Sequence, residues 1–157
     1  MERERIERYK NKIDLALDRL SKIEYNIDKF DDEMMRLAIY KAFQEVVEVL
    51  TDIISMILSD INHSIGDDYA NIDKIKDTVK LNNIEVEILY EANGLRNRII
   101  HWYNKTDNEQ AKESIERLIP EINKILIKLL EFIKNFKNDK TKNKNKKFKK
   151  GFFIFKR

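Results

Sequence analysis

The sequence contains no cysteine, only three glycines and only one proline among its 157 residues. The absence of cysteine excludes disulfide-stapled folds, thiolate zinc sites and cysteine nucleophiles. Because turn-forming residues are so few, the sequence argues against a turn-rich β-sandwich or barrel. The two histidines, His63 and His101, are too few for a multi-histidine metal site within one chain. We therefore expect neither a metal nor another cofactor.

Long apolar runs are also missing. No stretch approaches the roughly 18 apolar residues that a membrane helix needs. The first eight residues, MERERIER, are charged and lack the apolar segment of a signal peptide. We expect a cytoplasmic protein without integral membrane insertion. With 42% apolar and 38% charged residues, the chain has enough apolar content for one core beneath a heavily charged surface.

Apolar residues recur every three or four positions, which predicts amphipathic helices, and no segment alternates as a half-buried strand would. Pro120 should kink or break the last helix, because an interior proline costs about 3 kcal/mol. Thr106 and Glu109 have the spacing of a capping box before that helix. The fold class is therefore all-α: an antiparallel helical bundle of four main helices plus a short fifth. The expected main helices cover about 3–26, 33–62, 83–103 and 108–136, with a loop over 63–73 and the short helix over 75–81.

The charge is divided unevenly along the chain. Residues 138–157 hold eight lysines, one arginine and a single acid, which leaves the rest of the chain with a net charge of −5. We expect a helical bundle over 1–137 and a basic, phenylalanine-containing tail over 138–157. A solvated extension is the simplest interpretation of the tail. Stacking on single-stranded nucleic acid and shallow insertion into lipid also fit its mixture of lysine and phenylalanine.

One short segment carries the residue types of phosphodiester chemistry. Arg96, Asn97, His101 and Tyr103 bring a cation, an amide, an imidazole and a phenol within eight residues. RNA cleavage needs a base for the 2′-hydroxyl, an acid for the leaving oxygen and positive charge on the phosphoryl oxygens. Histidine exchanges a proton near neutral pH, and the planar guanidinium of arginine matches a phosphate.

Helix geometry limits how Arg96 and His101 could cooperate. On a continuous helix, residues five apart point about 140° away from each other. The two side chains converge only if the helix ends or bends between them, or if a second chain supplies the partner. A symmetric dimer would also supply two histidines, one for each proton transfer. The alternative is structural: Arg96 pairs with an acid, and His101 caps the end of a helix.

The string from Gly94 to Tyr103, GLRNRIIHWY, resembles the signature of the HEPN superfamily in its HepT-like toxin branch. That signature is an arginine, a polar residue, three further residues and then His-x-Tyr. Ile65-Gly66 followed by Asp68-Tyr69 is similar to a loop motif that precedes it in the same branch. The helix order agrees as well, so the resemblance covers about residues 3–136.

The resemblance implies an all-helical homodimer that acts as a metal-independent RNA endonuclease, the toxin of a toxin–antitoxin pair. It implies that Arg96 and His101 are the catalytic pair and that Asn97 supports them. Tyr103 matches the tyrosine that the partner, an MntA-like nucleotidyltransferase antitoxin, adenylylates to silence the toxin. Arg98 is a possible additional RNA contact, although a solvent-facing arginine is the more ordinary interpretation. The alternative function is a non-catalytic HEPN-like scaffold that binds a nucleotidyltransferase or nucleotides.

Overall fold

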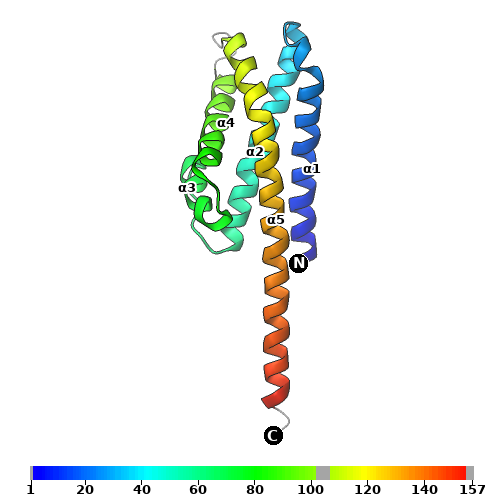
Figure 1. Cartoon of the computed structure of the whole chain (residues 1–157), viewed down its shortest axis with the longest axis vertical. Helices are drawn as coiled ribbons and strands as arrows, with labels where there is room; N and C mark the ends of the chain where they lie inside the picture. Colours follow the sequence, from blue (N-terminus) through cyan, green and yellow to red (C-terminus); the bar gives the residue numbers. More distant parts are fainter. Residues whose placement is uncertain (1, 102–106, 155–157) are drawn as a thin grey trace.

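The computed structural model describes residues 2–101 and 107–154, and this part of the chain is helical throughout apart from short connections (Figure 1). The all-α class and the bundle architecture are therefore confirmed. The elements, in chain order, are α1 (Glu2–Asn26), a 3₁₀ turn (Ile27–Lys29), α2 (Glu33–Asp60), α3 (Asp68–Val79), α4 (Asn83–His101) and α5 (Asn108–Ile154). None of the helices in these ranges is long and apolar enough to cross a membrane.

Ion pairs along α1 and α2 show that the first two helices are antiparallel. Near the start of α1, Arg5 Nε lies 3.1 Å from Asp60 Oδ2 at the end of α2. Further along α1, Arg19 Nε lies 2.6 Å from Glu45 Oε2. Half-buried pairs near the surface, such as these, contribute modest stability each. The first pair joins the start of α1 to the end of α2, and the second joins a later part of α1 to an earlier part of α2. Helix α2 therefore runs back beside α1.

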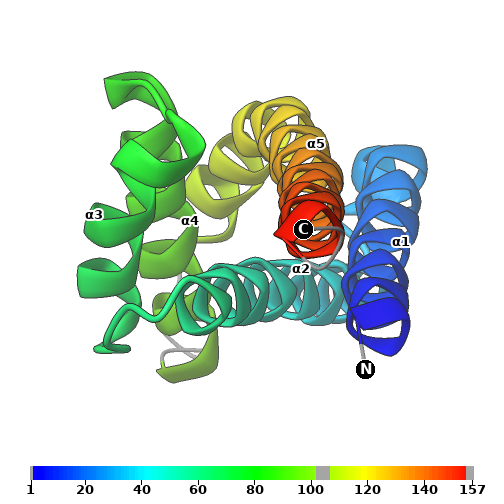
Figure 2. The same cartoon turned by 90° about the horizontal axis from the view of Figure 1, so that it is seen from below.

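The second half of the fold is antiparallel in the same way. Lys128 on α5 contacts Glu85 near the start of α4, with Nζ 2.9 Å from Oε2. Arg117, nearer the start of α5, pairs with Glu91 further along α4. Viewed along the bundle, α2 lies between α1 and the α3–α4 pair, and α5 packs across α1 and α4 (Figure 2).

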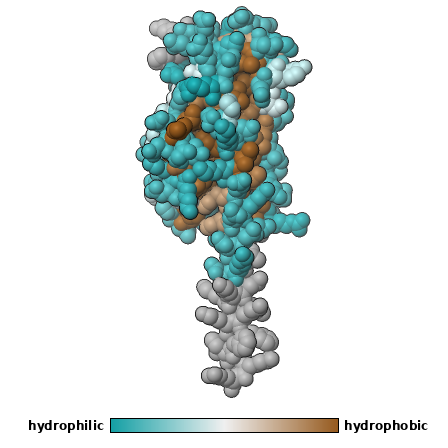
Figure 3. Space-filling view, viewed as in Figure 1, coloured by the Kyte–Doolittle hydropathy of each residue, from teal (hydrophilic) through white to brown (hydrophobic). Residues whose placement is uncertain are grey.

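The core fills the space between these helices. Helix α2 contributes most to it, because its apolar residues cover more than one side and face several neighbours. Phe43 and Leu58 of α2 are completely buried, as are Ile115 and Leu126 of α5. Charged and polar side chains cover most of the outside, with apolar strips visible between the helices in the view of Figure 3. The predicted apolar stripes of the main helices are thus the observed core.

Helix α3 is longer than the sequence pattern predicts, and the expected loop over 63–73 is wrong in its second half. The helix begins at Asp68, because the Asp67 side chain caps it by accepting a hydrogen bond from the Ala70 N–H at 2.8 Å. It ends at Val79, where Lys80 takes a left-handed conformation with φ of 61°. The turn residues around Gly66 therefore precede a helix start rather than extend a loop.

Helix α5 begins at Asn108, as predicted, but its capping residue and its end differ from expectation. Asp107 Oδ1 accepts hydrogen bonds from the Glu109 and Gln110 N–H groups, so Asp107 caps the helix, and Thr106 lies outside the described residues. Pro120 lies within α5 without ending it. The helix continues past the predicted end at Phe136 to Ile154, because no proline or glycine interrupts residues 121–150. A division into a bundle over 1–137 and a tail over 138–157 stays a prediction.

Candidate active site

Residues Gly94 to His101 of the signature segment form the last two turns of α4, and Trp102 and Tyr103 lie outside the described residues. Its apolar residues Leu95 and Ile99 are buried in the core, so they fix the rotation of the helix. Arg96 and Asn97 are half-buried beside them, whereas Arg98 and His101 are exposed. The segment therefore presents its polar side chains along one rigid, well-anchored helix end.

Arg96 is held by three oxygen acceptors. Its Nη2 donates to Asp68 Oδ2 at 2.9 Å and to Asn93 Oδ1 at 2.5 Å, and its Nε lies 3.3 Å from Asn97 Oδ1. The Arg96 side chain is only 12% exposed. Charge-assisted hydrogen bonds of this kind fix both position and orientation. The guanidinium is therefore preorganised, which a phosphate-binding group requires.

Asp68 and Asn93 are partners of Arg96 that sequence reasoning did not assign. Asn93 is 2% exposed and lies three residues before Arg96, on the same side of α4. Asp68 comes from α3, 28 positions earlier in the chain. The signal for Asn93 was the i, i+3 spacing. The signal for Asp68 was its place in the loop motif, to which no chemical role was given.

The loop before α3 is built to hold Asp68 in place. Asn71, which is 2% exposed, accepts a hydrogen bond from the Gly66 N–H at 2.8 Å and donates to the Gly66 carbonyl at 3.1 Å. A Cβ on Gly66 would lie 3.2 Å from the Ala70 Cβ, a tight contact, so a glycine suits this position. The Lys74 Nζ binds the Ser64 carbonyl at 2.8 Å. These contacts fix the loop and the helix start that carries Asp68.

Tyr69 connects the same loop motif to the signature segment. Its ring packs on Tyr90 of α4, with ring centroids 5.6 Å apart. Its hydroxyl lies near Gly94, 3.7 Å from where a Cβ would stand. Both halves of the motif therefore meet α4: Asp68 at Arg96, and Tyr69 at Gly94 and Tyr90. The two sequence features that carry the family resemblance are adjacent in space.

The structure does not bring Arg96 and His101 together within one chain. Helix α4 is continuous through His101, so the five-residue spacing places the two side chains about 140° apart. A helix end between them is thereby excluded. The structural alternative is confirmed for Arg96, which does pair with an acid. His101 lies in the last turn of α4, and Tyr103 lies outside the described residues.

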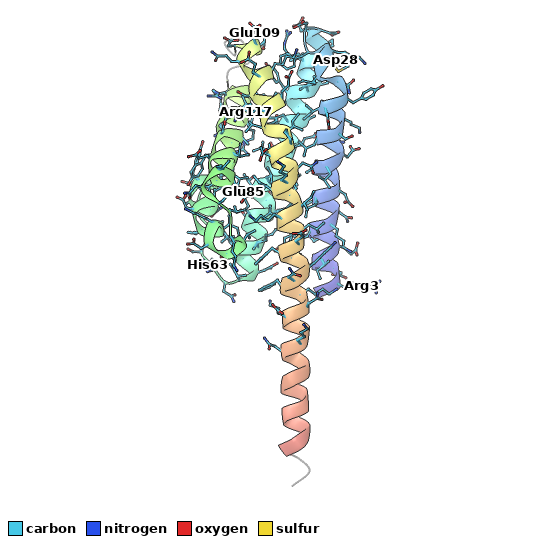
Figure 4. All side chains as sticks on the ribbon, in the orientation of Figure 1. Arg3, Asp28, His63, Glu85, Glu109 and Arg117 are labelled. Atoms are coloured by element: carbon cyan, nitrogen blue, oxygen red, sulfur yellow. The ribbon has the colours of Figure 1, made fainter. Side chains whose placement is uncertain are left out.

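The second histidine is remote from this segment. Figure 4 shows His63 at the end of the bundle opposite Glu109, whereas His101 ends α4 close to where α5 begins. Within residues 2–101 and 107–154, no group of three or more His, Cys, Asp or Glu side chains is arranged to hold a metal ion. The candidate site is thus the Arg96 cluster, defined as Arg96, Asp68, Asn93 and Asn97, together with the nearby His101.

Comparisons with known proteins assign this chain to a family. Residues 13–129, about three-quarters of the chain, match the family described as Ribonuclease HepT-like. A protein of Archaeoglobus fulgidus named as a candidate RNase is 33% identical over 100 residues, covering 64% of this chain and 75% of that protein. A second protein of the same organism and name is 29% identical over 131 residues, covering 83% and 94%. A candidate RNase of Methanocaldococcus jannaschii is 31% identical over 78 residues, covering 50% and 90%. The matched region contains the Arg96 cluster, the loop that holds it and His101, and the chain belongs to the HepT-like ribonuclease family.

Proposed function

We propose that this chain is a metal-independent RNA endonuclease that acts as the toxin of a toxin–antitoxin pair. The observation that carries the proposal is the preorganised guanidinium of Arg96 on the same helix that ends in the exposed His101. Family membership supports the ribonuclease activity. The pairing with an antitoxin rests on the resemblance of the signature segment alone.

The proposed chemistry assigns one role to each group. Arg96 binds the phosphoryl oxygens and offsets the charge that develops on them during the reaction. His101 exchanges protons with the attacking 2′-hydroxyl and the leaving 5′-oxygen. Asn97 supports the Arg96 side chain through its amide oxygen. Arg98, which is exposed one turn before the helix ends, is a possible contact to the RNA backbone.

The active site in this proposal is shared between two copies of the chain. Arg96 and His101 of one chain point about 140° apart, too far apart to hold the same phosphate. A two-fold homodimer that packs the α4 ends together brings the guanidinium of one copy near the imidazole of the other. It also supplies two histidines, so that one serves as base while the other serves as acid.

A cleavage assay tests the activity. His101→Ala should abolish RNA cleavage and growth inhibition while leaving the helical circular dichroism signal unchanged. His63→Ala is the matched control and should cleave as the parent does. Attack by the 2′-hydroxyl leaves a cyclic phosphate product and needs no added metal, so chelator should have no effect. Undiminished cleavage by the His101 variant would exclude the proposed mechanism, and absence of cleavage by the parent chain would favour the non-catalytic scaffold.

Mixed dimers test the shared site. An Arg96→Ala chain and a His101→Ala chain are co-expressed with different tags, and the heterodimer is isolated through both tags. A heterodimer retains one guanidinium beside one imidazole but only one of the two histidines, so it should cleave RNA faster than either variant homodimer and more slowly than the unmodified dimer. A heterodimer no more active than the His101→Ala homodimer would contradict a site in which Arg96 of one copy works with His101 of the other.

Regulation is proposed at Tyr103, two residues after His101. Adenylylation there by an MntA-like nucleotidyltransferase would add bulk and negative charge beside a site that attracts phosphate, so cleavage should stop. Co-expression with such an enzyme should increase the mass of the chain by one AMP group. Tyr103→Phe should remain unmodified and toxic. Modification of the Phe variant at an unchanged level would place the target tyrosine elsewhere.

A further inference from the structure

The last part of α5 projects beyond the bundle. We define residues 137–154 as the α5 extension. Figure 1 shows most of this segment continuing past the ends of the other helices, whereas Lys137 and Lys140 still lie beside the start of α1. By helix rise the residues after Lys140 add about 21 Å to the length of the molecule. Such a segment has no neighbouring core to serve, so its composition indicates what it contacts.

The first eleven residues of the α5 extension are basic and polar, and Phe148, Phe152, Phe153 and Ile154 follow at its far end. Residues 137–150 contain eight lysines and a single acid, Asp139. Residues 137–147 contain no apolar side chain at all, over about three helical turns. A helix that lies on a lipid surface needs an apolar face. These three turns contain no apolar residue and therefore have no such face. Cations without an apolar face suit a polyanion whose charge lies on its outside, such as a nucleic-acid backbone.

A cleft at the root of the α5 extension continues the basic surface into the bundle. It has a volume of about 560 Å³ and lies between the start of α1, the end of α2 and the middle of α5. Its lining includes Arg8, Lys137 and Lys140. Because the cleft is made from the same helix that forms the extension, we call it the root cleft.

The acids of the root cleft do not cancel its positive charge. Asp60 is already paired, since it accepts a hydrogen bond from Arg5 Nε at 3.1 Å and one from the Tyr9 hydroxyl at 2.6 Å. Burial and the bond to Asp60 raise the pKa of Tyr9 above its ordinary value, which keeps the phenol neutral. Glu4 is the other acid among the lining residues, which also include Arg5, Arg8, Lys137 and Lys140. The lining therefore holds four cationic side chains and two acidic ones.

We propose that the α5 extension and the root cleft together bind the phosphate backbone of the RNA substrate, away from the Arg96 cluster. The inference rests on the proposed ribonuclease function, because that function supplies RNA as the polyanion. Phosphate contacts of this kind position a strand without reading its sequence. The surface therefore contributes affinity for RNA in general and leaves the choice of cleavage site to the catalytic groups.

The position of the surface determines which step it affects. His101 and the start of α5 lie at one end of the bundle, and the α5 extension leaves from the other end (Figure 1). The part of α5 between Asn108 and Lys137 spans about 44 Å by helix rise. An RNA of a few nucleotides cannot reach both sites of one chain, whereas a long RNA can. Removing the lysines should raise KM for long RNA and leave kcat, and the cleavage of very short RNA, unchanged.

A binding experiment tests the surface without depending on catalysis. The His101→Ala chain is titrated into a labelled 40-nucleotide RNA at several salt concentrations, and the same is done after adding K142Q, K144Q, K146Q and K147Q. The quadruple change should weaken binding at least tenfold at low salt. It should also reduce the salt slope by up to about 3, since each phosphate contact in a single strand adds about 0.7. Glutamine and lysine have similar helix propensities, so the helix is retained.

A matched control distinguishes the loss of the extension lysines from a general decrease in the positive charge of the protein. Lys10, Lys22, Lys41 and Lys124 are exposed lysines of the bundle, and changing all four to glutamine removes the same charge elsewhere. This control should bind RNA nearly as the parent does. In the root cleft, Arg8→Gln with Lys140→Gln should weaken binding several-fold. Equal losses from the control and the extension variant would overturn the proposal, because they would show a general charge effect.

Two other outcomes would also overturn it. The first is unchanged RNA binding by the extension variant. The second is binding of the α5 extension to vesicles of phosphatidylcholine and phosphatidylserine with no effect on RNA, which would assign it to a membrane surface. Because RNA binding is measured on a cleavage-deficient chain, a failure of the proposed catalytic mechanism leaves this test intact. Conversely, a variant without the lysines of the extension should still cleave very short RNA. That cleavage measures the catalytic site separately from the extension.

Discussion

Asp68 of α3 receives a hydrogen bond from Arg96 of α4, with Arg96 Nη2 2.9 Å from Asp68 Oδ2. The bond joins the loop motif to the signature segment across 28 positions of sequence. The carboxylate is 35% exposed while the guanidinium is 12% exposed, so the acid supports Arg96 from its more open side. The relationship connects the two motifs physically: one supplies the Arg96 guanidinium and the other fixes its position.

Asp68→Asn should lower the kcat of RNA cleavage about tenfold while the fold is retained. The amide keeps an acceptor for Arg96 but removes the charge that orients it, and a tenfold loss corresponds to about 1.4 kcal/mol of transition-state stabilisation. Single-turnover cleavage and thermal unfolding measure the two quantities. Asp77→Asn, an exposed change on the same helix, is the control. Recovery of the rate in Asp68→Glu would support a positioning role, whereas full activity of Asp68→Asn would contradict it.

Asn71→Ala should destabilise the protein by roughly 1–3 kcal/mol, because both backbone groups of Gly66 lose their side-chain partner. The loop then no longer fixes the start of α3, so cleavage should fall as well. Urea unfolding gives the stability, and activity measured well below the unfolding midpoint gives the rate. The exposed Asn123→Ala on α5 should change neither. A stability equal to that of the parent would mean that the loop holds its shape without Asn71.

Much of the fold could be predicted from periodicity, because buried stripes such as Ile39, Phe43 and Leu50 have an unambiguous helical spacing. The start of α3 could not, since Gly66-Asp67-Asp68 is equally typical of a turn, and only the hydrogen bond from the Ala70 N–H identifies Asp67 as a cap. Sequence spacing selected Arg96 but not Asp68, because their contact depends on how α3 packs on α4.

The position of the capping box is a second feature that could not be predicted from the sequence. The sequence pattern placed it at Thr106 and Glu109, whereas α5 is capped by Asp107. A reciprocal pair is instead found before α4, where the Glu85 N–H donates to Asn82 Oδ1 at 2.8 Å and the Asn82 N–H donates to Glu85 Oε2 at 2.9 Å. Asparagine at the cap makes this pair less conspicuous in sequence than the usual serine or threonine.

The stability of the protein should depend on the charge of Glu85 at acidic pH. Burial alone would raise the pKa of Glu85, but the hydrogen bonds from Lys128 and the Asn82 N–H outweigh it and lower the pKa below its ordinary value of 4.5. A lowered pKa in the folded state means that the stabilisation is present above pH 4.5 and is lost as the pH falls through the folded value.

Glu85→Gln should therefore reduce stability at pH 7 by up to about 1 kcal/mol, and the difference from the parent should shrink toward pH 3. Glutamine still completes the capping pair, so the change isolates the ionic contact with Lys128. Urea unfolding at both pH values measures it, with the exposed Glu87→Gln as control. A difference that is constant with pH would show that the charge is not responsible.

Gly94→Ala should stabilise the protein by about 0.5–1 kcal/mol, because glycine is costly within a helix. The added Cβ would lie 3.7 Å from the Tyr69 hydroxyl, an ordinary contact. Gly66→Ala serves as the comparison. Its added Cβ would lie 3.2 Å from the Ala70 Cβ, a tight contact, so this variant should not be more stable than the parent. Thermal unfolding of both variants measures the effect. A lower melting temperature for Gly94→Ala would mean that the helix surface there has no room for a methyl group.

The uninterrupted course of α5 also determines how its outer half can be studied. Starting a helix is unfavourable, whereas adding residues to one already formed is nearly neutral. The buried residues Leu118 and Leu126 provide that established start inside the bundle. A synthetic peptide covering residues 137–154 would lack it and would also carry lysine pairs that repel each other at i, i+4 spacing. Such a peptide is expected to be a random coil in dilute buffer, so its lysines can be tested as a helical array only while they remain attached to the domain.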